Sequence, residues 1–131
     1  MRILIDTHIL LWHFMGSERL KPALRSILFD ETNLIEVSVA SIWEISIKVS
    51  QGKLDLSGGH SQLMNFINRT HINIMPIESV HIETLYTLPW HHRDPFDRMI
   101  AAQAIAEQID LISDDIAFDA YFETQTTQRL R

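Results

Sequence analysis

The sequence predicts an α/β domain built on a parallel β-sheet. Short apolar and β-branched segments alternate with segments of helical periodicity along the chain, and acidic or hydroxyl residues follow several of the apolar segments. In folds of this class, ligands bind outside the carboxyl ends of the strands. The chain has 131 residues, of which 46% are apolar, so we expect one domain spanning residues 1–131.

The first strand and the first two helices are predicted near the N-terminus. Met1–Ile5 is apolar enough for a short buried strand, and Asp6 ends it. Thr7 is placed to cap a helix through Ile9–Phe14. A second helix is expected over Leu20–Phe29, because its apolar residues recur at helical spacing.

A second strand and its helix are predicted next. Asn33–Ala40 carries the alternating, β-branched residues that are typical of a strand. Ser41 and Glu44 match a capping box, which predicts a helix from Ser41 to about Gln51. Trp43 is expected in the core, so Glu44 would lie at the margin of buried surface, where an unpaired carboxylate is costly.

The middle of the chain continues the alternation. An amphipathic helix is expected over His60–Thr70, and a third strand over Ile72–Met75. A further helix is predicted from about Ser79 to Leu85, and the proline-bounded segment Pro89–Pro95 is expected to be a loop.

The last elements are a helix and a short strand. Asp94, followed by proline, is a common helix start and predicts a buried helix over Pro95–Gln108 with Asp94 as its N-cap. A fourth strand is expected over Leu111–Ile112, followed by a short helix. The polar tail Glu123–Arg131 is expected either to add an edge strand or to stay loose.

Composition argues against several classes of protein. The chain has no Cys, which rules out disulfides, thiolate zinc sites and cysteine nucleophiles. The apolar run Ile3–Ile5 is interrupted by Asp6 and His8, so we expect a cytoplasmic protein with no membrane partner. A net charge of −6 opposes nucleic-acid binding, but divalent cations held by acidic residues would reverse the local charge.

Four acidic residues stand where a strand ends or a helix begins, namely Asp6, Glu44, Asp97 and Asp115. The carboxyl ends of parallel strands meet at one edge of the sheet, so acids distant in sequence can converge there. Converged carboxylates repel one another unless a proton or a counter-ion neutralises them. Oxygen ligands suit Mg²⁺ or Mn²⁺, which also bind phosphate, so the sequence predicts a cation site for phosphoryl chemistry.

Each acid also has a structural interpretation when it is taken alone. Asp6 can be a helix cap or a turn residue, and Glu44 can complete the capping box. Asp97 lies in the first turn of its helix, where the helix dipole is expected to lower its proton affinity. Of the adjacent acids Asp114 and Asp115, one is expected to face inward and the other to face solvent.

Other chemistries have less support. His8 and His13 lie five residues apart and His91 and His92 are adjacent, so neither pair has the i, i+4 spacing of helical zinc ligands. The chain lacks a Gly-rich phosphate loop and a G-x-S-x-G motif, which argues against P-loop NTPases and serine hydrolases. An aspartyl phosphatase would carry a second acid where His8 stands, and a receiver domain would need a Lys later than Lys53.

Four segments together resemble the PIN-domain nucleases, and within them the VapC-type toxins of prokaryotic toxin–antitoxin pairs. They occur in the family's order and cover almost the whole chain: Ile3–His8 with Leu10–Trp12, Ser41–Ile45, Arg93–Ala104 and Leu111–Asp115. The resemblance implies a PIN-like three-layer α/β/α domain with a central, mostly parallel sheet of four to five strands.

The resemblance also implies a function. The family's four acids fall on Asp6, Glu44, Asp97 and Asp115, which would be the catalytic and metal-binding residues, with Asp115 as the inward member of its pair. The implied activity is a Mg²⁺- or Mn²⁺-dependent endoribonuclease that cleaves RNA by water attack, forms a homodimer and is suppressed by a cognate antitoxin. The alternative is a catalytically inactive PIN-like module that binds RNA or protein.

Nearby polar residues receive supporting roles in this interpretation. Thr7 and Ser113 are candidate hydroxyls that orient the carboxylates. Asp94 is frequent in the toxin subgroup but lies outside the general metal-binding set, which agrees with its role as a helix cap. Arg98 is expected either to reach substrate phosphate or to pair with an acid.

Overall fold

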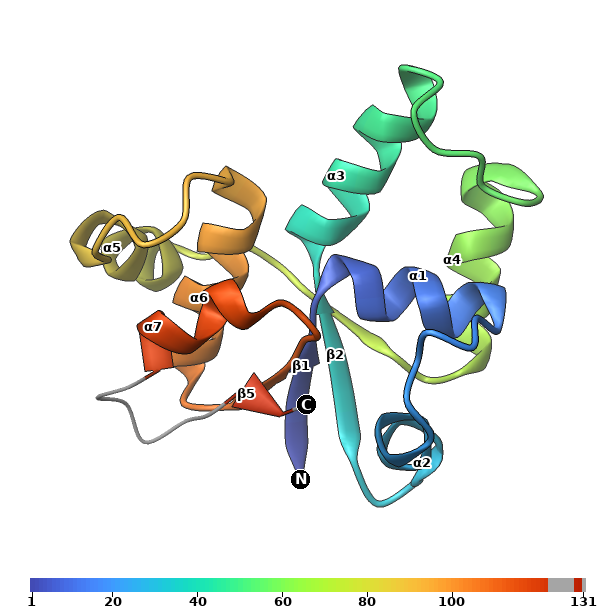
Figure 1. Ribbon diagram of the computed structural model, residues 1–131, viewed down its shortest axis with the longest axis horizontal. Helices are drawn as coiled ribbons and strands as arrows, with labels where there is room; N and C mark the ends of the chain where they lie inside the picture. The colour runs from blue at the N-terminus through green and yellow to red at the C-terminus, as the bar shows by residue number, and fades with distance from the viewer. Residues whose placement is uncertain (123–128, 131) are drawn as a thin grey trace.

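A five-stranded sheet forms the centre of the molecule, which we describe from a computed structural model over residues 1–122 and 129–130. The strand order is β3-β2-β1-β4-β5, and each strand is parallel to its neighbours (Figure 1). The strands are β1 (Arg2–Ile5), β2 (Leu34–Ser38), β3 (Asn73–Met75), β4 (Asp110–Ile112) and β5 (Arg129–Leu130). The predicted parallel sheet of four to five strands is confirmed.

Helices cover both faces of this sheet. In Figure 1, α1, α2 and α4 lie on one side of β1 and β2, whereas α5, α6 and α7 lie on the other. The helices are α1 (Thr7–Met15), α2 (Pro22–Phe29), α3 (Val39–Ser50), α4 (Gly59–Arg69), α5 (Ser79–Thr87), α6 (Pro95–Glu107) and α7 (Asp119–Phe122), with a 3₁₀ turn, η1 (Ile116–Phe118), before α7. The three-layer α/β/α architecture is therefore present, and helical crossovers are what parallel neighbours require.

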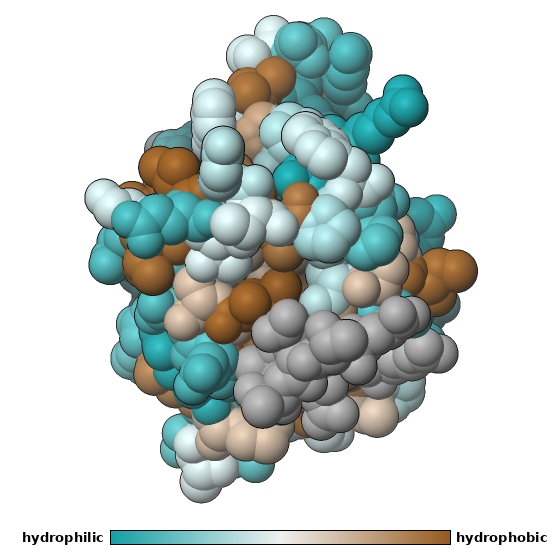
Figure 2. Space-filling view, turned by 90° about the vertical axis from the view of Figure 1, so that its left-hand side faces the viewer, coloured by the Kyte–Doolittle hydropathy of each residue, from teal (hydrophilic) through white to brown (hydrophobic). Residues whose placement is uncertain are grey.

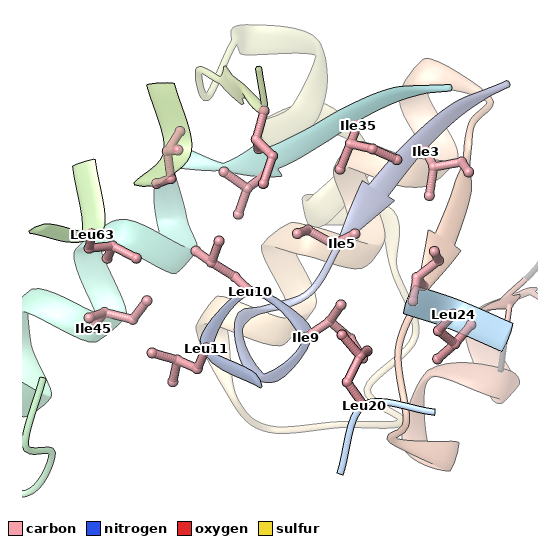
Figure 3. Close-up of a cluster of buried hydrophobic side chains, with 14 of the residues drawn as sticks. Ile3, Ile5, Ile9, Leu10, Leu11, Leu20, Leu24, Ile35, Ile45 and Leu63 are labelled. Atoms are coloured by element: carbon pink, nitrogen blue, oxygen red, sulfur yellow. The ribbon is translucent and has the colours of Figure 1, made fainter. Parts of the chain in front are cut away.

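The central strand β1 contributes to a hydrophobic core on each face of the sheet, because successive residues of a strand point in opposite directions. Ile3 and Ile5 pack with Leu10 of α1 on one face (Figure 3). Leu4 packs with Ile100 of α6 on the other. All of these side chains are fully buried, and each stabilises the fold by roughly 1.5–3 kcal/mol. The residue that follows β1 is consequently held in a fixed position.

The cap of α1 differs from the prediction. Asp6 is the N-cap, since its Oδ1 accepts a hydrogen bond from the Ile9 N–H at 2.9 Å, and Thr7 is the first residue of the helix. Both residues can cap a helix, so local preference does not decide between them. The buried Thr7 hydroxyl is engaged by Glu44 of α3 instead, and that tertiary contact assigns the cap to Asp6.

The start of α3 was also predicted incorrectly. The helix begins at Val39, and Ser38 caps it by accepting a hydrogen bond from the Ala40 N–H at 3.0 Å. Ser41 and Glu44 therefore lie inside the helix and form no capping box. The pattern S-x-x-E was misleading because β2 runs directly into α3, so that the hydroxyl at the strand end meets the first free N–H groups.

The inward-facing residue of α3 is Glu44 rather than Trp43, which corrects the expectation that Trp43 lies in the core. Trp43 is 59% exposed, whereas Glu44 is 5% exposed. Ala40, Glu44 and Ile45 belong to one buried stripe at helical spacing. The Trp43 ring packs edge-on against Phe96, with 5.1 Å between ring centroids.

The remaining elements agree with the sequence to within a few residues. α6 begins at Pro95 with Asp94 as its N-cap. In the tail, Arg129–Leu130 forms the edge strand β5 against β4, and the predicted tail residues 123–128 and 131 lie outside the described residues. Over the part of the chain that the structure describes, no helix has the length and apolar character needed to cross a bilayer.

Candidate metal centre

The candidate site lies at the carboxyl ends of β1 and β4. These neighbouring strands form the topological switch point of the sheet, because the chain leaves β1 into α1 on one face and leaves β4 toward α7 on the other (Figure 1). The Asp6 N–H donates to the Ile112 carbonyl at 3.1 Å, which ties the two strand ends together. The loops that follow therefore diverge around a shared crevice.

Asp6 is 2% exposed and both of its carboxylate oxygens accept hydrogen bonds. Besides the Ile9 N–H on Oδ1, the Ser113 hydroxyl donates to Oδ2 at 2.5 Å. Burial raises the pKa of Asp6 above its ordinary value, although these two hydrogen bonds and His8 act in the opposite direction. Asp6 is thus both the helix cap and a buried acid at the switch point.

Thr7 and Glu44 form a buried pair beside Asp6. The Thr7 hydroxyl donates to Glu44 Oε1 at 2.8 Å and lies 2.9 Å from the Ser41 hydroxyl. The other carboxylate oxygen, Oε2, pairs with Lys48 one helical turn further along α3 at 2.9 Å. The helix–helix contact between α1 and α3 therefore fixes the direction of the Glu44 side chain.

Asp97 sits in the first turn of α6, directly after the cap. Asp94 Oδ1 accepts from the N–H groups of Phe96 and Asp97 at 2.8 and 3.3 Å, so Asp94 is engaged in capping. The pKa of Asp97 is raised to about 7, first by burial and then by repulsion from Asp94, Glu44, Asp6 and Asp115. The predicted lowering of its proton affinity is wrong, because desolvation and neighbouring negative charge outweigh the helix dipole.

Asp115 and Asp114 point in different directions. Asp115 Oδ1 accepts from the Ala117 N–H at 2.9 Å, and its backbone N–H donates to the Ser113 hydroxyl at 3.0 Å. Asp114 pairs with Lys21 at 3.4 Å. The inward acid of the pair is Asp115, whose Oδ2 faces the loop before α6.

His92 also lies in this cluster, although its position was not expected from the sequence. Its Nε2 is 3.1 Å from Asp97 Oδ2 and 3.8 Å from Asp115 Oδ2. The adjacent His91 and His92 lie on the loop that was predicted over Pro89–Pro95, and their spacing is not that of helical zinc ligands. In the sequence, His92 stands two residues before Asp94, the N-cap of α6, and this position could have predicted that its side chain lies near Asp97.

Arg98 has a different environment from either role suggested by the sequence. It is 4% exposed, and its guanidinium donates to the Pro89 carbonyl at 2.8 Å and to the Leu85 carbonyl at 3.3 Å. The guanidinium carbon also lies 3.7 Å from the Trp90 ring centroid. Its donors hold the loop between α5 and α6, and Arg98 has no acid as an ion-pair partner over residues 1–122 and 129–130.

The arrangement suits a hard divalent cation. Ligand atoms of His92, Asp97 and Asp115 lie within 4.8 Å of one another, and Asp6 interacts electrostatically with both Asp97 and Asp115. Burial, followed by repulsion from four neighbouring acids, raises the pKa of Asp97 to about 7, which indicates that the site lacks positive charge. Carboxylate oxygens gathered in this way match the preference of Mg²⁺ and Mn²⁺.

Comparisons with known proteins agree with this architecture. A family model described as PIN domain matches residues 3–122. Among solved structures, VapBC2 from Rickettsia felis bound to a promoter DNA fragment is similar at 20% identity and a TM-score of 0.75, covering 98% of each chain. VapBC-1 from nontypeable Haemophilus influenzae is similar at 15% identity and a TM-score of 0.71, also covering 98% of each chain.

A third similar structure is VapBC-5 from Mycobacterium tuberculosis, described as a member of the VapBC family of toxin–antitoxin systems. It shares 16% identity and a TM-score of 0.66, covering 99% of this chain and 98% of that one. No curated protein sequence matches the chain significantly. At these identities the solved structures show a common fold. The family model, which spans almost the whole chain, shows that the protein belongs to the PIN-domain family.

Proposed function

We propose that this protein is a Mg²⁺- or Mn²⁺-dependent endoribonuclease that acts as the toxin of a toxin–antitoxin pair. The observation that carries the proposal is the electrostatic coupling of Asp6, Glu44, Asp97 and Asp115 at one end of the sheet. Asp6 and Glu44 are buried, whereas Asp97 and Asp115 are partly exposed. Acids that are coupled in this way are unfavourable unless positive charge compensates them. A site that binds cations and phosphate explains why all four acids lie together, whereas helix capping does not.

The four acids divide into two groups in the proposed mechanism. Asp6, Asp97 and Asp115 would hold the cation, directly or through water, and Glu44 would hold a second cation or position the attacking water. When bound, the cation supplies a water of lowered pKa and neutralises charge that develops on the phosphate. Cleavage would proceed by in-line displacement at phosphorus, as is general for phosphoryl transfer.

Two hydroxyls keep the carboxylates oriented in this mechanism. Ser113 donates to Asp6 Oδ2 and links it to the Asp115 backbone, while Thr7 donates to Glu44 Oε1. Groups in this position commonly fix the direction of ligand side chains. Because the hydroxyls come from different elements, the acids are oriented before any cation or substrate binds.

The proposed RNA path crosses a cavity of about 270 Å³ next to the acids. The cavity is lined by Asp6, His8, Trp12, Arg19, Asp114 and Asp115. Trp12, whose ring centroid is 6.1 Å from that of His8, offers an aromatic surface on which a base can stack. Arg19 offers positive charge for a phosphate, which the net charge of −6 otherwise makes scarce.

RNA cleavage is expected to require Mg²⁺ or Mn²⁺ and to stop in EDTA. The reason is that the acids alone present only negative charge to a phosphodiester. The measurement is gel analysis of a structured RNA incubated with purified protein and each metal, with the protein restored to metal after chelation as the control. Inertness toward a range of RNAs with both metals would support the inactive binding module instead.

We also propose two protein partners, a cognate antitoxin and a second copy of this chain. The first is supported by similarity to VapBC complexes. The second is supported by apolar side chains on and after α5, of which Ile82 is 54%, Tyr86 90% and Trp90 76% exposed. Figure 2 views the molecule from this side, where apolar residues are exposed among polar ones. Exposed apolar clusters commonly mark protein interfaces.

The dimer proposal predicts that Tyr86→Glu makes the protein monomeric, because a charge would be buried at the apolar contact. Light scattering coupled to size exclusion measures the mass. Thr87→Glu, which changes an exposed residue of the same helix outside this apolar set, is the control. A monomeric wild-type protein at micromolar concentration would contradict a stable dimer.

A further inference from the structure

His92 is held in a fixed orientation by the loop between α5 and α6. Its backbone N–H donates to the Tyr121 hydroxyl at 2.8 Å, and Arg98 lies 3.3 Å from the same hydroxyl while it binds the Pro89 carbonyl. A buried cation and a buried phenol thus fix the backbone on which the imidazole stands. The position of the His92 ring is a property of the fold rather than of a free surface side chain.

The hydrogen bonds of the ring define its tautomer. The backbone N–H of Asp94 donates to His92 Nδ1 at 3.1 Å, so Nδ1 carries a lone pair. In a neutral imidazole the proton must then be on Nε2. Nε2 lies 3.1 Å from Asp97 Oδ2, which makes His92 the donor and the Asp97 carboxylate the acceptor.

This tautomer argues against His92 as a direct metal ligand, even though its Nε2 is close to the oxygens of Asp97 and Asp115. Coordination through Nε2 needs a lone pair there and a proton on Nδ1. A proton on Nδ1 would face the Asp94 N–H, and two donors would then point at each other. The geometry therefore favours an outer role for the ring.

We propose that His92 is a positioning residue of the cation site, whose Nε2–H orients the Asp97 carboxylate so that Oδ1 is left for the cation. The proposal rests on the proposed function, in which Asp97 binds a divalent cation. It completes a pattern, since Ser113 donates to Asp6 and Thr7 donates to Glu44 in the same way. Among the donors to each of these three acids is one side chain from another element of the fold.

Calorimetric titration with Mn²⁺ tests this role on the whole protein. His92→Ala is expected to bind Mn²⁺ roughly 10–100-fold more weakly, as is typical when the partner of a ligand is removed. His92→Gln retains an N–H donor on a chain of similar reach, so it is expected to restore affinity to within about threefold of wild type. His91→Ala, the adjacent imidazole, is the matched control and should bind like wild type.

Electron spin-echo spectroscopy of bound Mn²⁺ separates positioning from coordination. Wild type is expected to show no strong ¹⁴N coupling from a directly bound imidazole. Such a coupling, lost in both His92 variants, would overturn the proposal and make His92 a ligand. Unchanged Mn²⁺ affinity in His92→Ala, with an unchanged melting temperature, would also overturn the proposal, because it would show that His92 has no role in cation binding. If the wild-type protein does not bind Mn²⁺, the result contradicts the proposed function itself, and with it the role of His92.

Discussion

Asp97→Asn is expected to reduce RNA cleavage by about 10³-fold or more. A cation that polarises phosphate contributes several kcal/mol to the transition state, and each 1.36 kcal/mol corresponds to roughly a factor of ten in rate. The amide replaces a carboxylate whose neighbours Asp6, Glu44 and Asp115 all couple to it. The loss should therefore appear in the rate constant of the cleavage step, measured in single-turnover assays at saturating metal.

The same substitution is expected to stabilise the cation-free protein at alkaline pH. The pKa of Asp97 is raised from 3.8 to about 7 in the folded state, so the folded state holds a proton that the unfolded state releases between these values. Stability from this group is fully present below pH 3.8 and is lost as pH rises through about 7. Asparagine does not titrate, so the variant does not lose stability in this way. At pH 8 its free energy of unfolding should exceed that of wild type by roughly 1–3 kcal/mol.

Thermal melting at pH 5 and pH 8 measures this effect, with the gain largest at pH 8. Asp55→Asn is the matched control, since Asp55 is exposed and lies in the loop after α3. If Asp97→Asn lost activity together with a collapsed melting transition, Asp97 would be a structural residue. Full activity in the variant would remove Asp97 from the cation site altogether.

Mn²⁺ affinity is expected to fall steeply below neutral pH. Because the pKa of Asp97 is about 7 in the cation-free protein, binding must displace a proton under acidic conditions. One displaced proton predicts that affinity decreases roughly 20–30-fold from pH 7.5 to pH 5.5. Above pH 7 the dependence should flatten. Calorimetry at several pH values gives both the affinity and the number of protons released.

The Asp97→Asn variant provides the internal control for this pH dependence. Residual Mn²⁺ binding in the variant should vary less with pH than binding in wild type, because the group with the raised pKa is gone. Affinity that stays constant from pH 5.5 to 7.5 in wild type would show that no displaced proton accompanies binding. That result would contradict the electrostatic description of the site.

The sequence was informative where one local signal determines the structure. Asp94 before proline predicted the start of α6, and that prediction also located Asp97 in the first turn of the helix. Parallel strands follow from alternating strand and helix segments, and this topology brings Asp6 next to Ser113, 107 residues away. The order of strands and helices was thus enough to predict that residues at the strand ends lie close together, although the sequence does not indicate any single contact between them.

The sequence failed where a tertiary contact overrides local preference. The capping box at Ser41 was wrong because β2 leads directly into α3, and Glu44 turns inward to meet Thr7. Arg98 could not be assigned because its acceptors are carbonyls of a loop whose path the sequence does not define. The raised pKa of Asp97 depends on burial and on acids from other elements, which the helix dipole alone does not anticipate.

Anomalous diffraction from crystals soaked in Mn²⁺ tests most directly whether the distant acids share a cation. An anomalous peak is expected at the carboxyl ends of β1 and β4, at about 2.0–2.3 Å from carboxylate oxygens of Asp6, Asp97 or Asp115 or bridged to them by ordered water. Crystals that bind Mn²⁺ only elsewhere, or that leave these acids without a cation at saturating metal, would contradict the proposed metal centre.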